Sequence, residues 1–318
     1  MSRLAPTLAA AVLTMSSAGT AVAADWSTGE DEWIEIDYTE TCGDGGFRGG
    51  FEPKDWSGLG DECDPLTFEF GTRYWYSWGA HRMTAAGDSY TQDDTSHILE
   101  AHARIDDHSS DVYVKGFAGH SAIVNSSYTT PTVPAGSAQA GRILYVGGDI
   151  GYMPLGTDNA RFGGFLGYQY WNDSPDMGRV NFGTGSLPND ISYNVFKLGL
   201  AGRIEFDGVA DITAEVAAVP YAQVSGTYGA FSDPGAPGDL TAPGSLRGWL
   251  YGASGEVMAR FHPLENWTVG IGGRAWYLTG QPDVTFSTDD GGGTDWITKA
   301  TQYSTLRYGL LGEVSYKF

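Results

Sequence analysis

From Leu66 to the C-terminus, apolar and polar residues alternate with a period of two. This pattern predicts β-strands that each have one apolar face. In the last segment Tyr308, Leu310 and Val314 share one face, and Arg307, Glu313 and Lys317 share the other. We predict ten such strands, at 66–78, 96–106, 111–119, 142–152, 161–171, 191–206, 209–219, 248–262, 267–278 and 302–318.

The connections between these strands alternate in length without exception. Four are short (107–110, 153–160, 207–208, 263–266) and five are long (79–95, 120–141, 172–190, 220–247, 279–301). Outer-membrane barrels have short periplasmic turns, longer extracellular loops and an even number of strands. The sequence therefore predicts an all-β fold, a transmembrane antiparallel up-and-down β-barrel of about ten strands whose ends both lie in the periplasm.

Charge is predicted to lie on one face only. We assign no Asp, Glu, Lys or Arg to the lipid-facing positions of the ten strands, where a midplane Arg or Lys would cost about 2–4 kcal/mol. The opposite faces carry eight acids and ten bases, so a nearly neutral interior is expected. Beside Asp149, Arg161, Lys197, Glu205, Asp211 and Lys317, we predict a charge network in the lumen made of Glu69, Arg73, Glu100, Arg104, Lys115, Arg203, Glu215, Glu256, Arg260, Arg274, Arg307 and Glu313.

Aromatic residues mark both predicted rims, as expected for rings at the headgroup level. Near the long loops these are Tyr76, Trp78, Tyr170, Trp249, Tyr251 and Tyr277. Near the short turns they are Phe68, Tyr152, Phe162, Phe206, Phe261, Trp267 and Phe318.

The N-terminus predicts export. Residues 1–23 combine Arg3, a short apolar core and Ala21-Val22-Ala23, which is typical of a cleaved signal peptide. Such a chain would leave the cytoplasm through the Sec pathway and reach the outer membrane. No later stretch approaches the ~20 apolar residues of a membrane helix.

Residues 24–65 form a separate acidic segment, with thirteen Asp or Glu residues against Arg48 and Lys54. It holds both cysteines of the chain, Cys42 and Cys63, which we expect to form one disulfide worth roughly 3 kcal/mol. Metal ligation by the two cysteines is the alternative. We expect this segment not to span the membrane. The formal net charge of −21 argues against nucleic-acid binding.

Two short motifs support a family resemblance. The ending Val314-Ser315-Tyr316-Lys317-Phe318 resembles the C-terminal signature of bacterial outer-membrane proteins, and Gly71–Ser77 resembles first strands of small, poorly characterised proteobacterial barrels. The resemblance covers roughly 66–318 and implies outer-membrane lipid as surroundings. It also implies the barrel-assembly machinery as a partner, which would read Tyr316 and Phe318.

Candidate chemistry is sparse. Omptin proteases, which are ten-stranded barrels, use paired aspartates and an Asp-x-His dyad, and Asp88, Asp93, Asp94 and His97 would supply only half of such a site. His81, His97 and His120 stand at the tops of adjacent strands and could bind a transition metal only if they converge. Acidic runs such as 60–64 lack the spacing of a calcium loop. We expect no catalytic residue, no metal and no cofactor.

The sequence therefore favours a non-enzymatic outer-membrane barrel, either a structural surface protein or a narrow porin-like channel with a charge-paired lumen. Five long loops rich in Ser, Thr, Gly, Asp and Tyr leave a loop-mediated adhesin or receptor as the alternative, with an unspecified extracellular partner. An omptin-like surface protease is the weakest of the three hypotheses.

Overall fold

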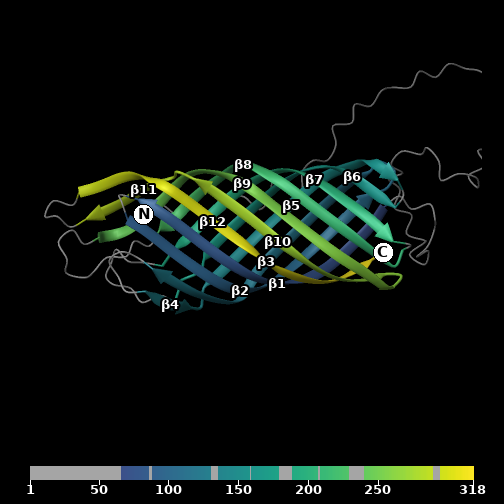
Figure 1. Cartoon of the computed structure of the whole chain (residues 1–318), viewed down its shortest axis with the longest axis horizontal. Helices are drawn as coiled ribbons and strands as arrows, with labels where there is room; N and C mark the ends of the chain where they lie inside the picture. Colours follow the sequence, from purple (N-terminus) through teal and green to yellow (C-terminus); the bar gives the residue numbers. More distant parts are fainter. Residues whose placement is uncertain are drawn as a thin grey trace, which may run out of the picture. The chain divides into compact units, whose positions relative to one another are not determined.

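The chain folds as a closed antiparallel β-barrel (Figure 1). The computed structural model describes residues 66–318 except 86–87, 130–134, 158, 179–187, 207, 229–239 and 289–293. No helix in the described residues is long and apolar enough to cross a bilayer. The predicted signal peptide, the acidic segment and the Cys42–Cys63 pair lie outside these residues.

Ten strands make the wall, and their order around the ring follows the chain. They are β1 (Leu66–Ala85), β2 (Asp88–Asp107), β3 (Val112–Thr129), β5 (Arg142–Thr157), β6 (Ala160–Ser174), β7 (Asp190–Phe206), β8 (Ala210–Tyr228), β9 (Leu240–Leu264), β10 (Trp267–Gly280) and β12 (Thr294–Lys317). Two short strands extend the wall at one end, β4 (Gly136–Gln139) on β3 and β11 (Asp283–Thr288) between β9 and β12. The predicted all-β fold, an antiparallel up-and-down barrel of ten strands, is confirmed.

The first and last strands close the ring. β1 pairs with β12 from Glu69↔Lys317 to Ala85↔Ala300. At the end of this seam the backbones of Phe68 and Phe318 exchange two hydrogen bonds of 2.9 Å. The Phe318 ring stacks on Phe68 and Phe70, with centroids 5.7 Å apart in both pairs. Phe318 thus contacts the first strand where the barrel closes.

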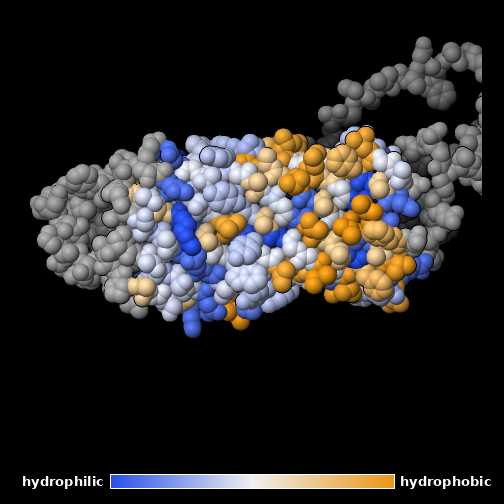
Figure 2. All heavy atoms as spheres, viewed as in Figure 1, coloured by the Kyte–Doolittle hydropathy of each residue, from blue (hydrophilic) through white to orange (hydrophobic). Residues whose placement is uncertain are grey.

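An apolar belt surrounds one half of the barrel. Figure 2 shows the apolar residues gathered on the half nearer the C-terminus, which is the end with the short turns. Outward residues of this belt, such as Leu99, Ile150, Leu198, Val257 and Leu310, are 53–60 % exposed (Leu99 60%, Ile150 54%, Leu198 54%, Val257 53%, Leu310 59%). Exposed apolar surface of this extent fits acyl chains rather than water.

One outward charge was missed. Arg142, the first residue of β5, points outward and is exposed, contrary to the assignment of no charge to the lipid faces. It lies at the far end of its strand from the short turns, where its guanidinium approaches Asn172 Oδ1 at 3.5 Å. Because Arg142 lies beyond the apolar belt, its charge does not bear the free-energy cost of an Arg at the bilayer midplane.

The strands run much further than predicted. β1 and β2 leave only residues 86–87 between them, so the expected long loop 79–95 is wrong. Likewise the expected turn 153–160 belongs largely to β5 and β6. In the parts of the strands that extend beyond the predicted bounds, the outward residues are polar: Arg82, Ser89, Asp93, Asn125, Ser127, Thr129, Ser245 and Arg247. Twenty residues of tilted strand rise about 50 Å, against about 25 Å for an apolar band, so this end of the wall extends beyond the belt.

The opposite end has tight turns. Gly208 has φ +70° between β7 and β8, a backbone conformation that favours glycine. At the end of β2, the Asp107 carboxylate accepts hydrogen bonds from the Ser109 and Ser110 hydroxyls at 2.6 and 2.7 Å. Apart from the two-residue connection 86–87, the connections at the other end are longer, as predicted.

A charge in the apolar belt is expected to destabilise the barrel. Leu198→Arg places a guanidinium on the belt and should cost about 2–4 kcal/mol, measured by reversible urea unfolding in lipid. Ser127→Arg, outward on the polar part of β3, is the matched control and should cost under ~0.5 kcal/mol. Equal losses in the two variants would contradict an apolar belt that ends below Ser127.

Candidate functional site

The lumen is the candidate site, and all twelve residues of the predicted charge network line it. Each is buried or half-buried, and each makes at least one ion pair with a carboxylate, guanidinium or ammonium group. The strands bring them inward because every second residue of a barrel strand faces the axis. They separate into a lower and an upper group, with aromatic rings between them.

The lower charge layer begins at the short-turn mouth. Arg260 Nε donates to Asp211 Oδ1 at 2.8 Å, and its Nη1 lies 3.3 Å from Glu69. Asp211 also pairs with Arg203 at 3.3 Å and with His262 Nε2 at 2.8 Å. β1 and β9 are not neighbours in the ring, so the Arg260–Glu69 pair crosses part of the lumen.

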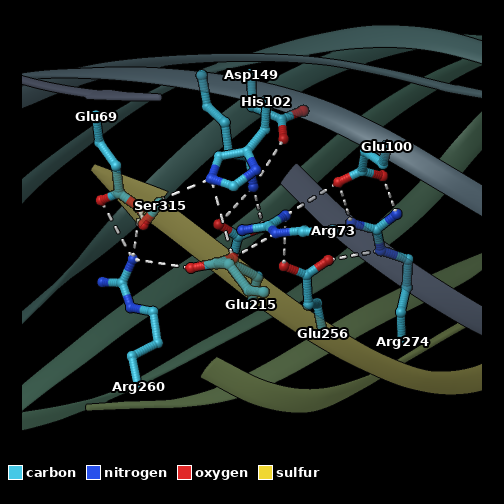
Figure 3. A network of polar contacts seen from close by, with 12 residues as sticks. Glu69, Arg73, Glu100, His102, Asp149, Glu215, Glu256, Arg260, Arg274 and Ser315 are labelled. Carbon is cyan, nitrogen blue, oxygen red and sulfur yellow. Dashed lines mark hydrogen bonds and ion pairs between the residues drawn. The ribbon is translucent and has the colours of Figure 1, made fainter. Parts of the chain in front are cut away.

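Further into the barrel the same layer centres on Arg73 (Figure 3). Arg73 pairs with Glu313 on the adjacent strand, with Glu100 at 3.2 Å and with Glu256 at 3.3 Å. Arg274 reaches Glu100 and Glu256, both at 2.6 Å. Two guanidiniums thus share two carboxylates, which holds four strands (β1, β2, β9 and β10) together inside the wall.

A second bridge crosses the lumen near its centre. Lys115 of β3 donates to both oxygens of Glu215 of β8 at 2.7 Å, and three strands separate β3 from β8 around the ring. Asp149 lies 3.3 Å from Lys115 and 2.9 Å from Lys197. Two ammonium groups therefore balance two carboxylates in this part of the layer.

Above the lower charge layer lies an aromatic layer that the sequence analysis did not predict. Tyr145 stacks on Trp171 with centroids 4.6 Å apart, and Trp75 meets the Trp171 edge at 6.0 Å. Trp276 contacts Trp171 at 5.0 Å. Trp75, Tyr145 and Trp171 are at most 2 % exposed. These rings come from β1, β5, β6 and β10 and meet at the axis.

The parity of the strands could have revealed these rings. Trp75 stands between Arg73 and Ser77 on the inward face of β1. The prediction for this face took account of its polar residues alone. Glycine marks the partner positions, because a Cβ at Gly119 would collide with the Tyr145 ring. A small residue opposite a large ring is the sign of a filled barrel interior.

The upper charge layer is centred on Arg307. Its guanidinium donates to Asp94 at 2.8 and 3.0 Å, to Asp173 at 2.9 Å and to Ser77 and Ser96. β12 and β6 stand five places apart among the ten strands, so the Arg307–Asp173 pair spans the full lumen. His81 joins it, 3.3 Å from Asp173. Nearby, the Tyr193 and Tyr303 hydroxyls, also from distant strands, share a hydrogen bond of 2.6 Å.

Side chains from opposite walls therefore meet at three successive levels. Two hollows lie outside these levels. One of about 410 Å³ is on the outer wall beside Phe162, Ile204 and Ile212, and one of about 400 Å³ opens at the short-turn mouth beside Arg203, His262 and Lys317. These contacts narrow the lumen at three levels in the described part of the chain.

The candidate catalytic residues do not come together in the described structure. Asp93 points outward and pairs with Arg82 at 2.6 Å, whereas Asp94 points inward to Arg307. His97 faces outward against the Tyr74 hydroxyl at 2.6 Å. The three rim histidines also diverge, because His81 is buried in the lumen while His97 and His120 face outward.

Comparison with solved structures places the fold among outer-membrane barrels. The Escherichia coli outer-membrane protease OmpT matches with a TM-score of 0.57 and 12% identity, over 82% of this chain and 99% of that one. The translocator domain of the Neisseria meningitidis autotransporter NalP (TM-score 0.35, 13% identity, covering 82% and 91%) and Ail of Yersinia pestis (TM-score 0.28, 9% identity, covering 79% and 98%) also match. At these identities the likeness shows the fold alone. No protein-family model matches the chain, and no curated protein matches it.

Proposed function

We propose that this protein is a non-conducting outer-membrane barrel that serves as a rigid pedestal for surface-exposed connections. The single observation that carries the proposal is the set of side-chain bridges across the lumen, above all Lys115–Glu215 and Arg307–Asp173. A charge buried inside a barrel is stable only when it is paired, and these pairs join opposite walls. Conduction would require breaking them.

The outer wall supports the pedestal role. Above the apolar belt the wall continues as a polar β-sheet that carries Arg82, Asp93, Asn125 and Ser127 outward. This end would face the cell exterior, with the short turns in the periplasm, by the usual polarity of such barrels. A tall, internally cross-linked wall holds its connecting segments away from the lipid headgroups, which suits recognition by an adhesin or receptor. The cross-lumen pairs argue against porin-like transport, and the separate directions of Asp93 and Asp94 argue against proteolysis.

Planar-bilayer recording tests the proposal directly. The refolded full chain should insert without producing steady current steps, while a porin of known conductance gives steps in the same bilayer. Heat-modifiable migration in gels establishes that the inserted protein is folded. Steady single-channel openings from folded barrel would overturn the proposal and restore the narrow-channel hypothesis.

A further inference from the structure

We propose that Glu69, His102 and Glu313 form a binding site for a divalent transition-metal ion inside the lower charge layer. The three side chains come from β1, β2 and β12, and all are buried. One ligand atom from each lies within 4.8 Å of the other two. Figure 3 shows the His102 ring lying between Glu69 and Arg73, directed at the carboxylates.

The distances fit ligands around a shared ion better than hydrogen bonds. His102 Nε2 lies 3.7 Å from Glu69 Oε1 and 4.0 Å from Glu313 Oε2, beyond the 2.7–3.2 Å range of N–H···O bonds. Two ligands of a tetrahedral ion with bonds of about 2.1 Å stand about 3.4 Å apart. A closure of a few tenths of an ångström would therefore bring all three atoms to an ion.

The imidazole itself is the independent observation. His102 is 5 % exposed, yet neither ring nitrogen has a hydrogen-bond partner among the described residues, and Glu313 Oε1 has none either. A buried polar atom without a partner costs about 1–3 kcal/mol. Gly71 leaves room for the ring, since a Cβ at that position would lie 2.5 Å from His102 Cε1. The sequence thus keeps space for an imidazole whose ring nitrogens no described residue hydrogen-bonds.

The formal charge of the layer is compatible with a cation. The ion-paired network that contains Glu69 and Glu313 has six carboxylates (Glu69, Glu100, Glu205, Asp211, Glu256, Glu313) and four guanidiniums (Arg73, Arg203, Arg260, Arg274) among the described residues, hence a formal −2. Lys317 attracts Glu69 and Asp211 and reduces the excess to −1. A divalent ion would bring the excess from −1 to +1, and one with affinity for both imidazole and carboxylate, such as Zn²⁺, fits the donor set.

Access is available from the short-turn mouth. The hollow beside Arg203, His262 and Lys317 opens there, and His262 contacts Asp211, which pairs with Arg260 next to Glu69. An ion entering this mouth would displace Arg260 from Glu69, where the present contact is 3.3 Å. The ion would then connect β1, β2 and β12 at the barrel seam.

Zinc binding by the refolded full chain tests the site. After incubation with ZnCl₂ and dialysis, metal analysis should find one more zinc per barrel in the wild type than in His102→Gln. Titration calorimetry should show this site weakened by at least about tenfold, a loss that even second-shell substitutions reach. His102→Gln keeps the acidic segment and the cysteines, so the difference from the wild type belongs to the lumen site. His120→Gln removes an outward histidine and should match the wild type.

Two results would overturn the inference. One is equal zinc content and equal affinity in the wild type and His102→Gln. The other is no bound zinc in wild-type barrel that gel mobility shows to be folded. Glu69→Gln, which keeps the shape of the side chain, should lose zinc while remaining folded by gel mobility.

Discussion

Arg307→Met is expected to lower the free energy of unfolding by about 3–5 kcal/mol, the cost of removing one partner from a buried ion pair. The guanidinium is 1 % exposed, and the carboxylates of Asp94 and Asp173 on opposite sides of it are fully buried. Methionine fills a similar volume but leaves both carboxylates without a cation. Urea unfolding of the barrel in lipid vesicles, followed by tryptophan fluorescence, measures the loss.

Arg82→Met is the matched control for this loss. Arg82 belongs to the same end of the barrel, but its pair with Asp93 has side chains 43% and 54% exposed, so its removal should cost under ~1 kcal/mol. The triple variant Asp94→Asn, Asp173→Asn, Arg307→Met should recover part of the stability, because no buried charge is left alone. A triple variant as unstable as Arg307→Met alone would show that the damage comes from packing rather than from unpaired charge.

The stability of these pairs and the proposed lack of conduction have the same cause. A ten-stranded barrel is only modestly wider than the eight-stranded kind that side chains can fill. Large residues at the inward positions, such as Trp75, Tyr145 and Arg73, meet partners three places away around the ring. The bridges inside the lumen are therefore a consequence of ring size and residue size together.

The sequence predicted the ten crossings because lipid imposes a strong pattern. Within the belt, outward positions must be apolar, as Leu198 and Val257 are, so alternation is visible. Beyond the belt, water accepts polar residues outside, as at Asp93 and Ser127, and the alternation fades although the hydrogen-bond ladder continues. For this reason the alternation predicts shorter strands than β1 and β2 and a long loop at 79–95.

The inner face was harder to predict than the outer face. Alternation shows that Arg73 and Lys115 face the lumen, but partners depend on strand tilt and ring closure, which bring β3 to β8 and β12 to β6. The partners Asp94 and Asp173 of Arg307 fell in predicted loops, and only the extended strands place them inside. The Glu69–His102–Glu313 cluster joins residues up to 244 positions apart in sequence, a distance that no local pattern carries.

Trp171→Ala should be comparably damaging, with an expected loss of about 3–5 kcal/mol for removing a buried aromatic ring. The indole touches Tyr145, Trp75 and Trp276, and the Arg307 guanidinium lies 5.7 Å above its ring. Alanine leaves a cavity between the two charge layers and removes the ring beside the Arg307–Asp173 pair. Urea unfolding in vesicles gives the magnitude, with tyrosine emission and circular dichroism replacing part of the lost tryptophan signal.

Trp249→Ala separates this effect from the general loss of a tryptophan. Trp249 faces outward at 54 % exposure, with its ring tilted against Tyr221 at 4.1 Å, so its removal should cost about 1 kcal/mol or less. Bilayer recording of Trp171→Ala adds a second readout. The cavity is bounded below by Lys115–Glu215 and above by Arg307–Asp94, so the variant should remain silent although it is destabilised. Steady current from Trp171→Ala would mean that the aromatic layer alone closes the barrel, and that the charge layers admit ions past their paired side chains.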